Sequence, residues 1–462
     1  MASTSALQAQ VGPSGQRWAA FLAQIGERAK SAEGFLVQGS LTRMVGLTLE
    51  ATGCTTSVGG RCLVSAADGS KVEAEVVGFS EGRVFLMPTD DLHGIMPGAP
   101  VIPSRQVFSV QAGNALLGRV LDGAGQPLDN AGPLVCEDQV RLIPKPMNPL
   151  DRAPITQALD VGIRCINGLL TVGRGQRLGL FAPSGVGKSM LLGMMTRFTE
   201  ADVIVVGLIG ERGREVQEFV SNCLDESARR KAVVVATPAD YPPLMRVHGA
   251  LLATSIAEYF RDKGCQVLLL MDSLTRFAQA HREIALAIGE LPATKGYPAS
   301  VFARLPQLVE RAGTGGANGG TITGFYTVLT EIDDSNDPVA DSARAILDGH
   351  IVLSRRLAES GLYPAIDIEK SISRTIQSII TPQHAEMIRK FRELNGVYQE
   401  NRDLITIGAY ASGSDSRVDN AISHWPHMLE YLRQNDRVSV PFDQSLLDLG
   451  QLFSTSASVE EG

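Results

Sequence analysis

Short hydrophobic runs separated by Gly, Ser and Asp fill the chain between residues 34 and 103. Four of these runs have strand character, at residues 34–41, 61–64, 71–79 and 83–87. Regularly spaced short strands with turn signals between them are typical of a small barrel or sandwich. We therefore predict a β-barrel domain over residues 34–103.

From residue 104 the pattern changes to apolar runs that alternate with helical stretches such as 245–263. The strand candidates are rich in Val, Ile and Leu without polar alternation, at residues 177–181, 203–209, 232–236, 266–271 and 321–329. Such runs indicate a parallel sheet buried on both faces. We predict an α/β domain over residues 104–377, in which the Gly-rich stretch 313–320 forms a flexible loop.

Both ends of the chain differ from this core. From residue 378 the sequence is mostly helical, most clearly at 386–395 and 417–435, which predicts a C-terminal helical domain over 378–462. Residues 1–16 have the composition of a poorly ordered segment. An amphipathic helix is predicted at 17–30, where Trp18, Phe21, Leu22 and Ile25 have helical spacing. This helix either packs on the first domain or docks a partner.

Composition excludes several classes of protein. The 462 residues suffice for about three domains. The net charge of −8 argues against a protein that mainly binds nucleic acid, although a local basic channel stays possible. No signal peptide begins the chain and no apolar run approaches a bilayer span, so any membrane contact would be peripheral. The six cysteines form no C-x-x-C pair, which favours buried thiols over a zinc site or disulfides.

The segment QRLGLFAPSGVGKSMLLGMM carries the clearest chemical signal, because a strand enters a small-residue turn and a helix leaves it. Gly185 and Gly187 let backbone N–H groups point inward, and the helix N-terminus adds positive charge. Lys188 can bridge β- and γ-phosphates, and the Ser189 hydroxyl can bind Mg²⁺. The predicted nucleotide-binding residues of this loop are Ala182, Pro183, Ser184, Gly185, Val186, Gly187, Lys188, Ser189 and Met190.

This loop departs from the usual pattern at two positions. Ala182 stands where the G-x-x-x-x-G-K-S pattern has glycine, a change of one methyl group. Pro183 fixes φ and removes one N–H donor. Nucleotide affinity falls if that donor normally faces phosphate and is unchanged if it faces away.

Three further residues complete the candidate site. Asp272 ends an apolar strand and is a candidate Mg²⁺ ligand, as such residues are in P-loop enzymes. Arg276 follows it and either reaches phosphate or pairs with a local carboxylate. Glu211 follows the strand at 203–209 and could activate water, but its charge pattern alone favours a solvated turn.

Several strings together resemble the ATPases of bacterial type III protein export, which are relatives of the catalytic subunit of rotary ATP synthases. The strings are GERGREVQEF, SGVGKS, MDSLTRFAQAHREIALAIGE, GYPASVFARLPQLVERAG and LAESGLYPAIDIEKSISR. SGVGKS and DLHGIMPGAPV are most similar to the flagellar branch. The resemblance implies an N-terminal β-barrel, a central RecA-like P-loop domain with a parallel sheet, and a C-terminal helical domain.

The resemblance also implies roles that spacing does not show. Glu211 would orient the attacking water, with Arg212 beside it, and Arg374 would reach the neighbouring subunit's site. Tyr363 would stack on adenine, although core packing is the alternative. The catalytic set implied is therefore Glu211, Lys188, Arg374 and Arg212, with ATP and Mg²⁺ as cofactors and Ser189 and Asp272 as metal ligands.

The function implied is ATP hydrolysis coupled to export of flagellar proteins at the inner face of the cytoplasmic membrane. The partners implied are a homohexamer, a central stalk, the export gate, chaperones and flagellar cargo. Residues 1–33 would bind a negative regulator, and no nucleic acid is expected. The alternatives are a virulence secretion ATPase, a non-catalytic subunit of a rotary-type ring, and an RNA-translocating hexamer.

Overall fold

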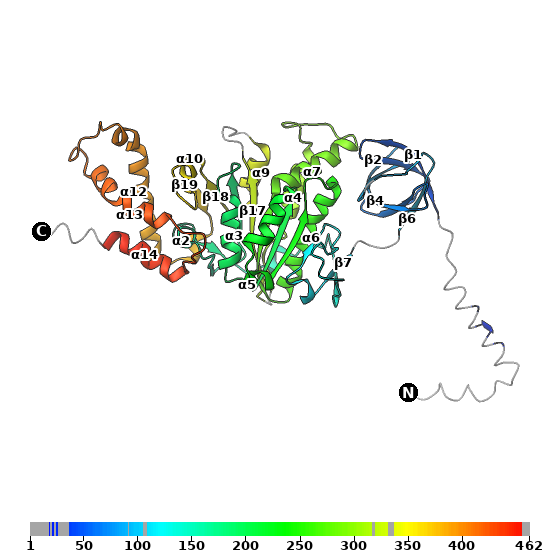
Figure 1. The fold of residues 1–462 in the computed structure, drawn as a ribbon, viewed down its shortest axis with the longest axis horizontal. Coiled ribbons are helices and arrows are strands. Elements are labelled where there is room, and N and C mark those ends of the chain that lie inside the picture. Colours follow the sequence, from blue (N-terminus) through cyan, green and yellow to red (C-terminus); the bar gives the residue numbers. More distant parts are fainter. Residues whose placement is uncertain are drawn as a thin grey trace, which may run out of the picture.

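The computed structural model describes residues 37–90, 92–104, 109–316, 319–330 and 337–454, together with Trp18, Phe21, Leu22 and Ile25. Three parts follow one another along the molecule (Figure 1). The barrel lies at one end, an α/β domain lies in the middle, and the C-terminal helices lie at the other end.

Six antiparallel strands close the barrel in the order β1-β2-β5-β4-β3-β6. Their bounds are β1 Gly39–Val45, β2 Thr48–Thr52, β3 Arg61–Ser65, β4 Lys71–Ser80, β5 Arg83–Pro88 and β6 Pro100–Pro103. In β4 the side chains of Val72, Ala74 and Val76 are buried at every second position. This alternation fills the barrel with apolar side chains and leaves the intervening ones outside.

The central sheet runs β19-β18-β12-β17-β15-β13-β14-β8, and β16 pairs with β17. All neighbours are parallel except β18–β19 and β16–β17. The strands are β8 Val120–Leu121, β12 Arg177–Ala182, β13 Val203–Ile209, β14 Ala232–Thr237, β15 Gln266–Asp272, β16 Gly313–Thr314, β17 Thr321–Leu329, β18 Gly349–Leu353 and β19 Ile366–Ser373. The five predicted strands coincide with β12, β13, β14, β15 and β17 within one residue at each end.

The predicted loop at 313–320 is wrong at its start. Gly313 and Thr314 are buried and form β16, because Thr314 pairs with Thr321 at the start of β17. The short strands outside the main sheet pair with each other, β7 Ser109–Ala112 with β9 Asp138–Arg141 and β10 Ala158–Leu159 with β11 Val172–Gly173.

Helices cover both faces of the central sheet, and two separate apolar clusters lie against its two faces. The helices are α2 Arg164–Leu169, α3 Lys188–Phe198, α4 Gly213–Glu218, α5 Glu226–Arg230, α6 Pro243–Asp262, α7 Leu274–Ala287, α8 Ala299–Val309, α9 Pro338–Ile346 and α10 Arg355–Glu359. The 3-10 turns η1 Asn114–Leu116 and η2 Pro149–Asp151 and the π-helical turn η3 Phe219–Cys223 complete this domain. The unbroken apolar runs seen in the sequence are therefore strands with no solvated face.

The C-terminal part is formed by α11 Ile376–Ile379, α12 Pro382–Thr406, α13 Ser416–Leu432 and α14 Phe442–Ser454. The prediction of 386–395 covered only part of α12. Its buried residues are His384, Ile388, Phe391 and Asn395, all within its first fourteen residues. Beyond Asn395 no residue of α12 is fully buried, and the apolar side chains of Val397, Tyr398, Leu404 and Ile405 are half-buried or exposed.

Two other predictions meet the structure only in part. The four described residues of the predicted N-terminal helix are helical and exposed, from 45% for Ile25 to 64% for Trp18. The rest of the segment 1–33 lies outside the described residues, so its partner stays open. All six cysteine thiols are free, but only Cys62 and Cys165 are buried and the other four are half-buried.

Candidate active site

The predicted phosphate loop joins β12 to α3, whose first residue is Lys188. Gly185 has φ +80° and Gly187 has φ +91°, which is the left-handed region where glycine carries no steric cost. Gly187 is also the N-cap of α3. The free N–H groups of the first helical turn therefore lie beside this loop, which is the arrangement that binds phosphate.

Three predicted site residues meet at the carboxyl edge of the sheet. Lys188 Nζ donates to Asp272 Oδ1 at 2.6 Å and lies 3.4 Å from Glu211 Oε1. Thr327 Oγ1 on β17 donates to the same Asp272 oxygen at 2.6 Å. These residues come from or directly follow β13, β15, β17 and the phosphate loop, and parallel strands bring their carboxyl ends to one edge.

The electrostatics of this cluster follow from its burial. The pKa of Glu211 is raised to about 7, first by burial and next by the negative charge of Asp272, while the positive charge of Lys188 opposes the change. Burial alone would lower the pKa of Lys188, but the charges of Asp272 and Glu211 outweigh it and raise this pKa. The ammonium group is thus charged and is held by carboxylates beside the phosphate loop. An incoming triphosphate could replace them as its partner.

The raised pKa of Glu211 predicts an acid limb in the pH profile. Glu211 can accept a proton only when it is ionised, so kcat/KM for ATP should fall below about pH 7, approaching tenfold per pH unit. The measurement is kcat/KM between pH 5.5 and 8.5 with Mg²⁺ in excess over ATP. The Arg374→Ala variant keeps Glu211, so the activity that it retains should show the same limb. A profile that is flat from pH 6 to 8 would contradict a raised pKa for Glu211 in the working enzyme.

Ser189 and Asp272 fit the requirements of Mg²⁺. This ion keeps several waters and usually takes one or two protein oxygens together with phosphate oxygens. Ser189 is exposed at the start of α3. Asp272 is buried beside Lys188, with an exposed fraction of 4%. No group of three or more His, Cys, Asp or Glu suited to a metal occurs among the described residues. A metal site here would therefore depend on the nucleotide for its remaining ligands.

The two departures in the loop have different structural settings. Ala182 is the last residue of β12, and its buried methyl group belongs to the same apolar cluster as Val186. The extra methyl group therefore packs in the core. Pro183 follows directly and is half-buried. Its effect on nucleotide affinity stays a prediction.

Tyr363 lies against the phosphate loop. A Cβ atom on Gly187 would lie 3.3 Å from Cε1 of Tyr363 and 3.6 Å from Cε of Met190, so these two side chains flank the glycine. The ring is half-buried rather than enclosed in the core. This position is compatible with the adenine-stacking role, which stays a prediction. Sequence reasoning missed Arg355, whose Nη2 atom donates to the Ser184 carbonyl at 3.4 Å.

The remaining predicted arginines do not converge on this cluster. The Arg212 side chain is 80% exposed and lies 3.8 Å from Glu215. Arg276 packs against Gly210 and donates to Gln279 at 2.8 Å, so its partner is an amide and not the carboxylate that was the alternative to phosphate. The Nε atom of Arg276 is buried without a partner among the described residues. Phosphate contacts of Arg212 and Arg276 would require rotation of their side chains.

Arg374 lies at the opposite end of the parallel strands, where they begin. Ser373, which precedes it, pairs with Gly349 at the start of β18, and the Arg374 N–H donates to Asp348 O. This position is level with the start of β12, whereas the phosphate loop follows the end of that six-residue strand. The separation is roughly 20 Å at ~3.3 Å per residue. Arg374 is exposed there.

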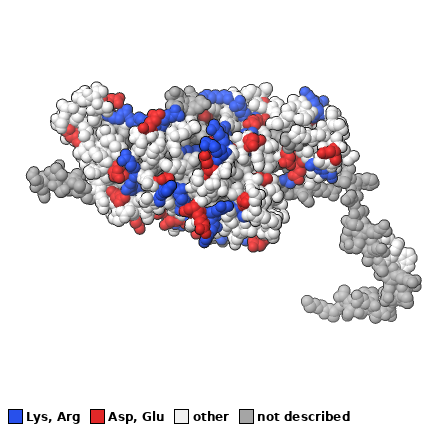
Figure 2. Space-filling view, in the orientation of Figure 1, with Lys and Arg blue, Asp and Glu red and all other residues white. Residues whose placement is uncertain are grey.

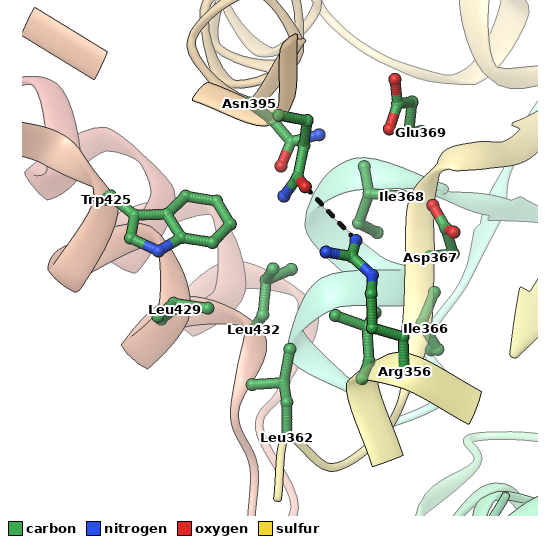
Figure 3. Close-up of a pocket in the computed structure, with 12 residues that line it drawn as sticks. Arg356, Leu362, Ile366, Asp367, Ile368, Glu369, Asn395, Trp425, Leu429 and Leu432 are labelled. Atoms are coloured by element: carbon green, nitrogen blue, oxygen red, sulfur yellow. Dashed lines mark hydrogen bonds between the residues drawn. The ribbon is translucent and has the colours of Figure 1, made fainter. Parts of the chain in front are cut away.

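A pocket away from this cluster lies where α10 and β19 meet the C-terminal helices (Figure 3). Leu362, Ile366, Trp425 and Leu429 supply much of its apolar lining. Arg356 Nη2 donates to Gln399 Oε1 of α12 at 3.3 Å across it. The predicted site residues do not line this pocket, and its contacts attach the C-terminal helices to β19.

Comparison with known proteins identifies the family. The nucleotide-binding domain of the ATP synthase alpha/beta family matches residues 162–373, and its beta-barrel domain matches residues 42–105. The T3SS EscN ATPase C-terminal domain matches residues 380–451. The flagellum-specific ATP synthase of Pseudomonas aeruginosa is 59% identical over 422 residues, which cover 91% of this chain and 94% of that protein. The chain belongs to the flagellum-specific ATP synthase family.

Other members and a solved relative agree with this family. The flagellum-specific ATP synthase of Salmonella typhimurium is 58% identical over 90% of this chain and 94% of that protein. The assembled ATPase EscN from the enteropathogenic E. coli type III secretion system matches with a TM-score of 0.85 and 41% identity, over 90% of this chain and 99% of that one. The predicted type III export family and the barrel, nucleotide-binding and helical architecture are thus confirmed for this member of the flagellum-specific ATP synthase family.

Proposed function

We propose that this chain hydrolyses Mg²⁺-bound ATP in a homohexameric ring and that hydrolysis drives the export of flagellar proteins through a type III secretion apparatus. The observation that carries the proposal is the contact of Lys188 with Asp272 and Glu211 beside a glycine-rich loop. In a member of this family, that cluster has the parts of a hydrolytic site.

The roles of the residues follow from their positions. Lys188 would exchange its carboxylate partners for the β- and γ-phosphates, which frees an oxygen of Asp272 that also accepts from Thr327. Ser189 and Asp272 would hold Mg²⁺, which neutralises charge on the phosphate oxygens when bound. Glu211 would orient a water and take its proton. Tyr363, whose ring lies beside Gly187, would stack on the adenine ring.

The position of Arg374 supports a ring. Arg374 lies near the start of the parallel strands and its own phosphate loop lies at their end, so it cannot complete the site of its own subunit. An arginine supplied to the next subunit around a closed ring can do so. EscN has been solved in an assembled state and in complex with its central stalk EscO. These structures support a homohexamer and a central stalk as partners of this chain.

The other partners follow from the proposed export role. They are the export gate, chaperones and flagellar cargo, a negative regulator at residues 1–33, and a peripheral contact with the inner face of the cytoplasmic membrane. No helix in the described part of the chain has the length and apolar character needed to cross a bilayer. Basic and acidic side chains are interspersed on the face that Figure 2 shows, which supports leaving nucleic acid out of the proposal.

The alternatives fit the observations less well. Identity to the flagellum-specific ATP synthase of Pseudomonas aeruginosa is 59%, against 41% to the EscN structure from a virulence system, so the flagellar role is favoured. A non-catalytic ring subunit has no need of Glu211 and Lys188 in contact. RNA translocation predicts stimulation by RNA, which the experiment below measures.

The test is an ATPase assay over a wide range of protein concentration. Specific activity should rise steeply as the concentration increases, because a site that needs a neighbour's arginine exists only in assembled protein. RNA should leave the activity unchanged, and Lys188→Ala should give the baseline at every concentration. Specific activity independent of concentration would contradict the ring, and activity in Lys188→Ala equal to wild type would contradict the proposed site.

A further inference from the structure

Gln176 is a buried polar side chain that the proposed mechanism does not use. Its exposed fraction is 0%, and it lies directly before β12, the strand that leads to the phosphate loop. Its Nε2 atom donates to Ser373 Oγ at 3.0 Å and to the Asp348 carbonyl at 3.1 Å. Its Oε1 atom accepts from the Gly173 N–H at 2.9 Å. The amide thus joins three backbone segments inside the domain.

Two of these segments, at Ser373 and Asp348, hold the backbone of Arg374 in place. Ser373 precedes Arg374 in the chain, and Ser373 Oγ also donates to the Thr171 carbonyl at 3.1 Å. The Arg374 N–H donates at 3.0 Å to the same Asp348 carbonyl that Gln176 contacts. Asp348 is fixed in turn by Arg177, whose Nε and Nη2 atoms donate to its two carboxylate oxygens at 2.9 and 3.0 Å.

The side chain of Arg374 is held much less firmly than its backbone. It is exposed, and the contact recorded for its guanidinium is Nη2 to the Arg344 carbonyl at 3.1 Å. Buried and fully satisfied hydrogen bonds rigidify the groups that they join. The arrangement therefore combines a rigid backbone at Arg374 with an exposed guanidinium that can exchange its Arg344 contact for one in a neighbouring subunit.

We propose that Gln176 is a positioning residue for Arg374, so that its hydrogen bonds serve hydrolysis in the neighbouring subunit and not in its own. This inference rests on the proposed function, in which Arg374 completes the neighbour's site. A displacement of about 1 Å in a reacting constellation can lower a rate about 10²-fold. Through Ser373 and the Asp348 carbonyl, the amide of Gln176 fixes the backbone that carries the Arg374 side chain.

The first variant is Gln176→Leu, which keeps the approximate volume and removes the hydrogen bonds. We expect kcat to fall about 10- to 100-fold with KM for ATP changed less than about threefold, because the chain's own phosphate loop is intact. Ser373→Ala is a milder second variant that removes one partner of Gln176 and tests the same idea if Gln176→Leu does not fold. Asp129→Asn is the stability control, because it weakens the Arg119–Asp129 ion pair at β8, the opposite edge strand.

Mixed rings decide which site is impaired. Each test variant is mixed as dilute protein with one of two reference variants, and the mixture is then concentrated. Glu211→Gln has an inactive site of its own but keeps Arg374. Arg374→Ala has an intact site of its own but supplies no arginine to its neighbour. Gln176→Leu should regain activity when mixed with Glu211→Gln, which supplies arginines to its intact sites. It should gain nothing from Arg374→Ala, because neither partner presents a correctly placed arginine.

The opposite pattern, with recovery by Arg374→Ala and none by Glu211→Gln, would place the defect in the chain's own phosphate loop and overturn the inference. So would wild-type kcat in both Gln176→Leu and Ser373→Ala. The mixture of the two reference variants tests the underlying function separately. If Glu211→Gln and Arg374→Ala do not restore each other, the arginine does not act between subunits, and the proposed ring mechanism fails whatever Gln176 does.

Discussion

Replacement of Arg374 by alanine should lower kcat by about 10³- to 10⁵-fold, which is the range for an arginine that stabilises a transferring phosphoryl group. ATP binding should be nearly unchanged, because the site that Arg374 completes keeps its own Lys188 and phosphate loop. The measurement is steady-state ATPase activity at saturating protein concentration, together with calorimetric binding of a non-hydrolysable ATP analogue.

Arg417→Ala is the matched control for this variant. Arg417 is also an exposed arginine, and it pairs with Asp415 at the start of α13. Its loss should leave kcat within about twofold, because exposed ion pairs of this kind contribute little. Arg374→Lys should restore only part of the activity, since an ammonium group cannot bind phosphate in the bidentate manner of a guanidinium. Near-normal kcat in Arg374→Ala would remove the arginine from the mechanism.

Glu211→Gln should lower kcat by about 10²- to 10⁴-fold, the usual contribution of a general base. ATP should bind at least as tightly as to the wild type. Glu211 and Asp272 both lie close to Lys188, so an amide in place of one carboxylate removes a negative charge that a triphosphate would otherwise meet. Single-turnover hydrolysis and calorimetry on the same preparation separate the loss of chemistry from any change in binding.

The control for this variant is Glu218→Gln in the helix that follows. Glu218 is exposed and pairs with Arg214 one turn earlier on α4, so its replacement should change neither binding nor turnover. Loss of ATP binding in Glu211→Gln would assign this carboxylate to nucleotide binding or to folding. Turnover close to the wild type would mean that another group activates the water.

The sequence by itself determined the core of the nucleotide-binding domain. The unbroken apolar runs match β12, β13, β14, β15 and β17 because a parallel sheet covered on both faces leaves no position for polar alternation. The phosphate loop was equally readable, since glycine, lysine and serine at fixed spacing between a strand and a helix form a local structure. The antiparallel edge strand β19 was not predicted, because its buried positions are irregular.

Other features were decided only by the tertiary structure. Charge pattern favoured a solvated turn for Glu211, whereas the parallel sheet places it 3.4 Å from Lys188. Spacing could not distinguish Arg374 from a surface arginine, and only the register of β18 and β19 shows that it lies across the sheet from its own phosphate loop. Gln176 gave no signal, although it joins three segments. The physical reason is the same in each case: local sequence specifies the conformation of a segment, whereas these contacts join residues far apart in the chain, and only packing of the sheet brings them together.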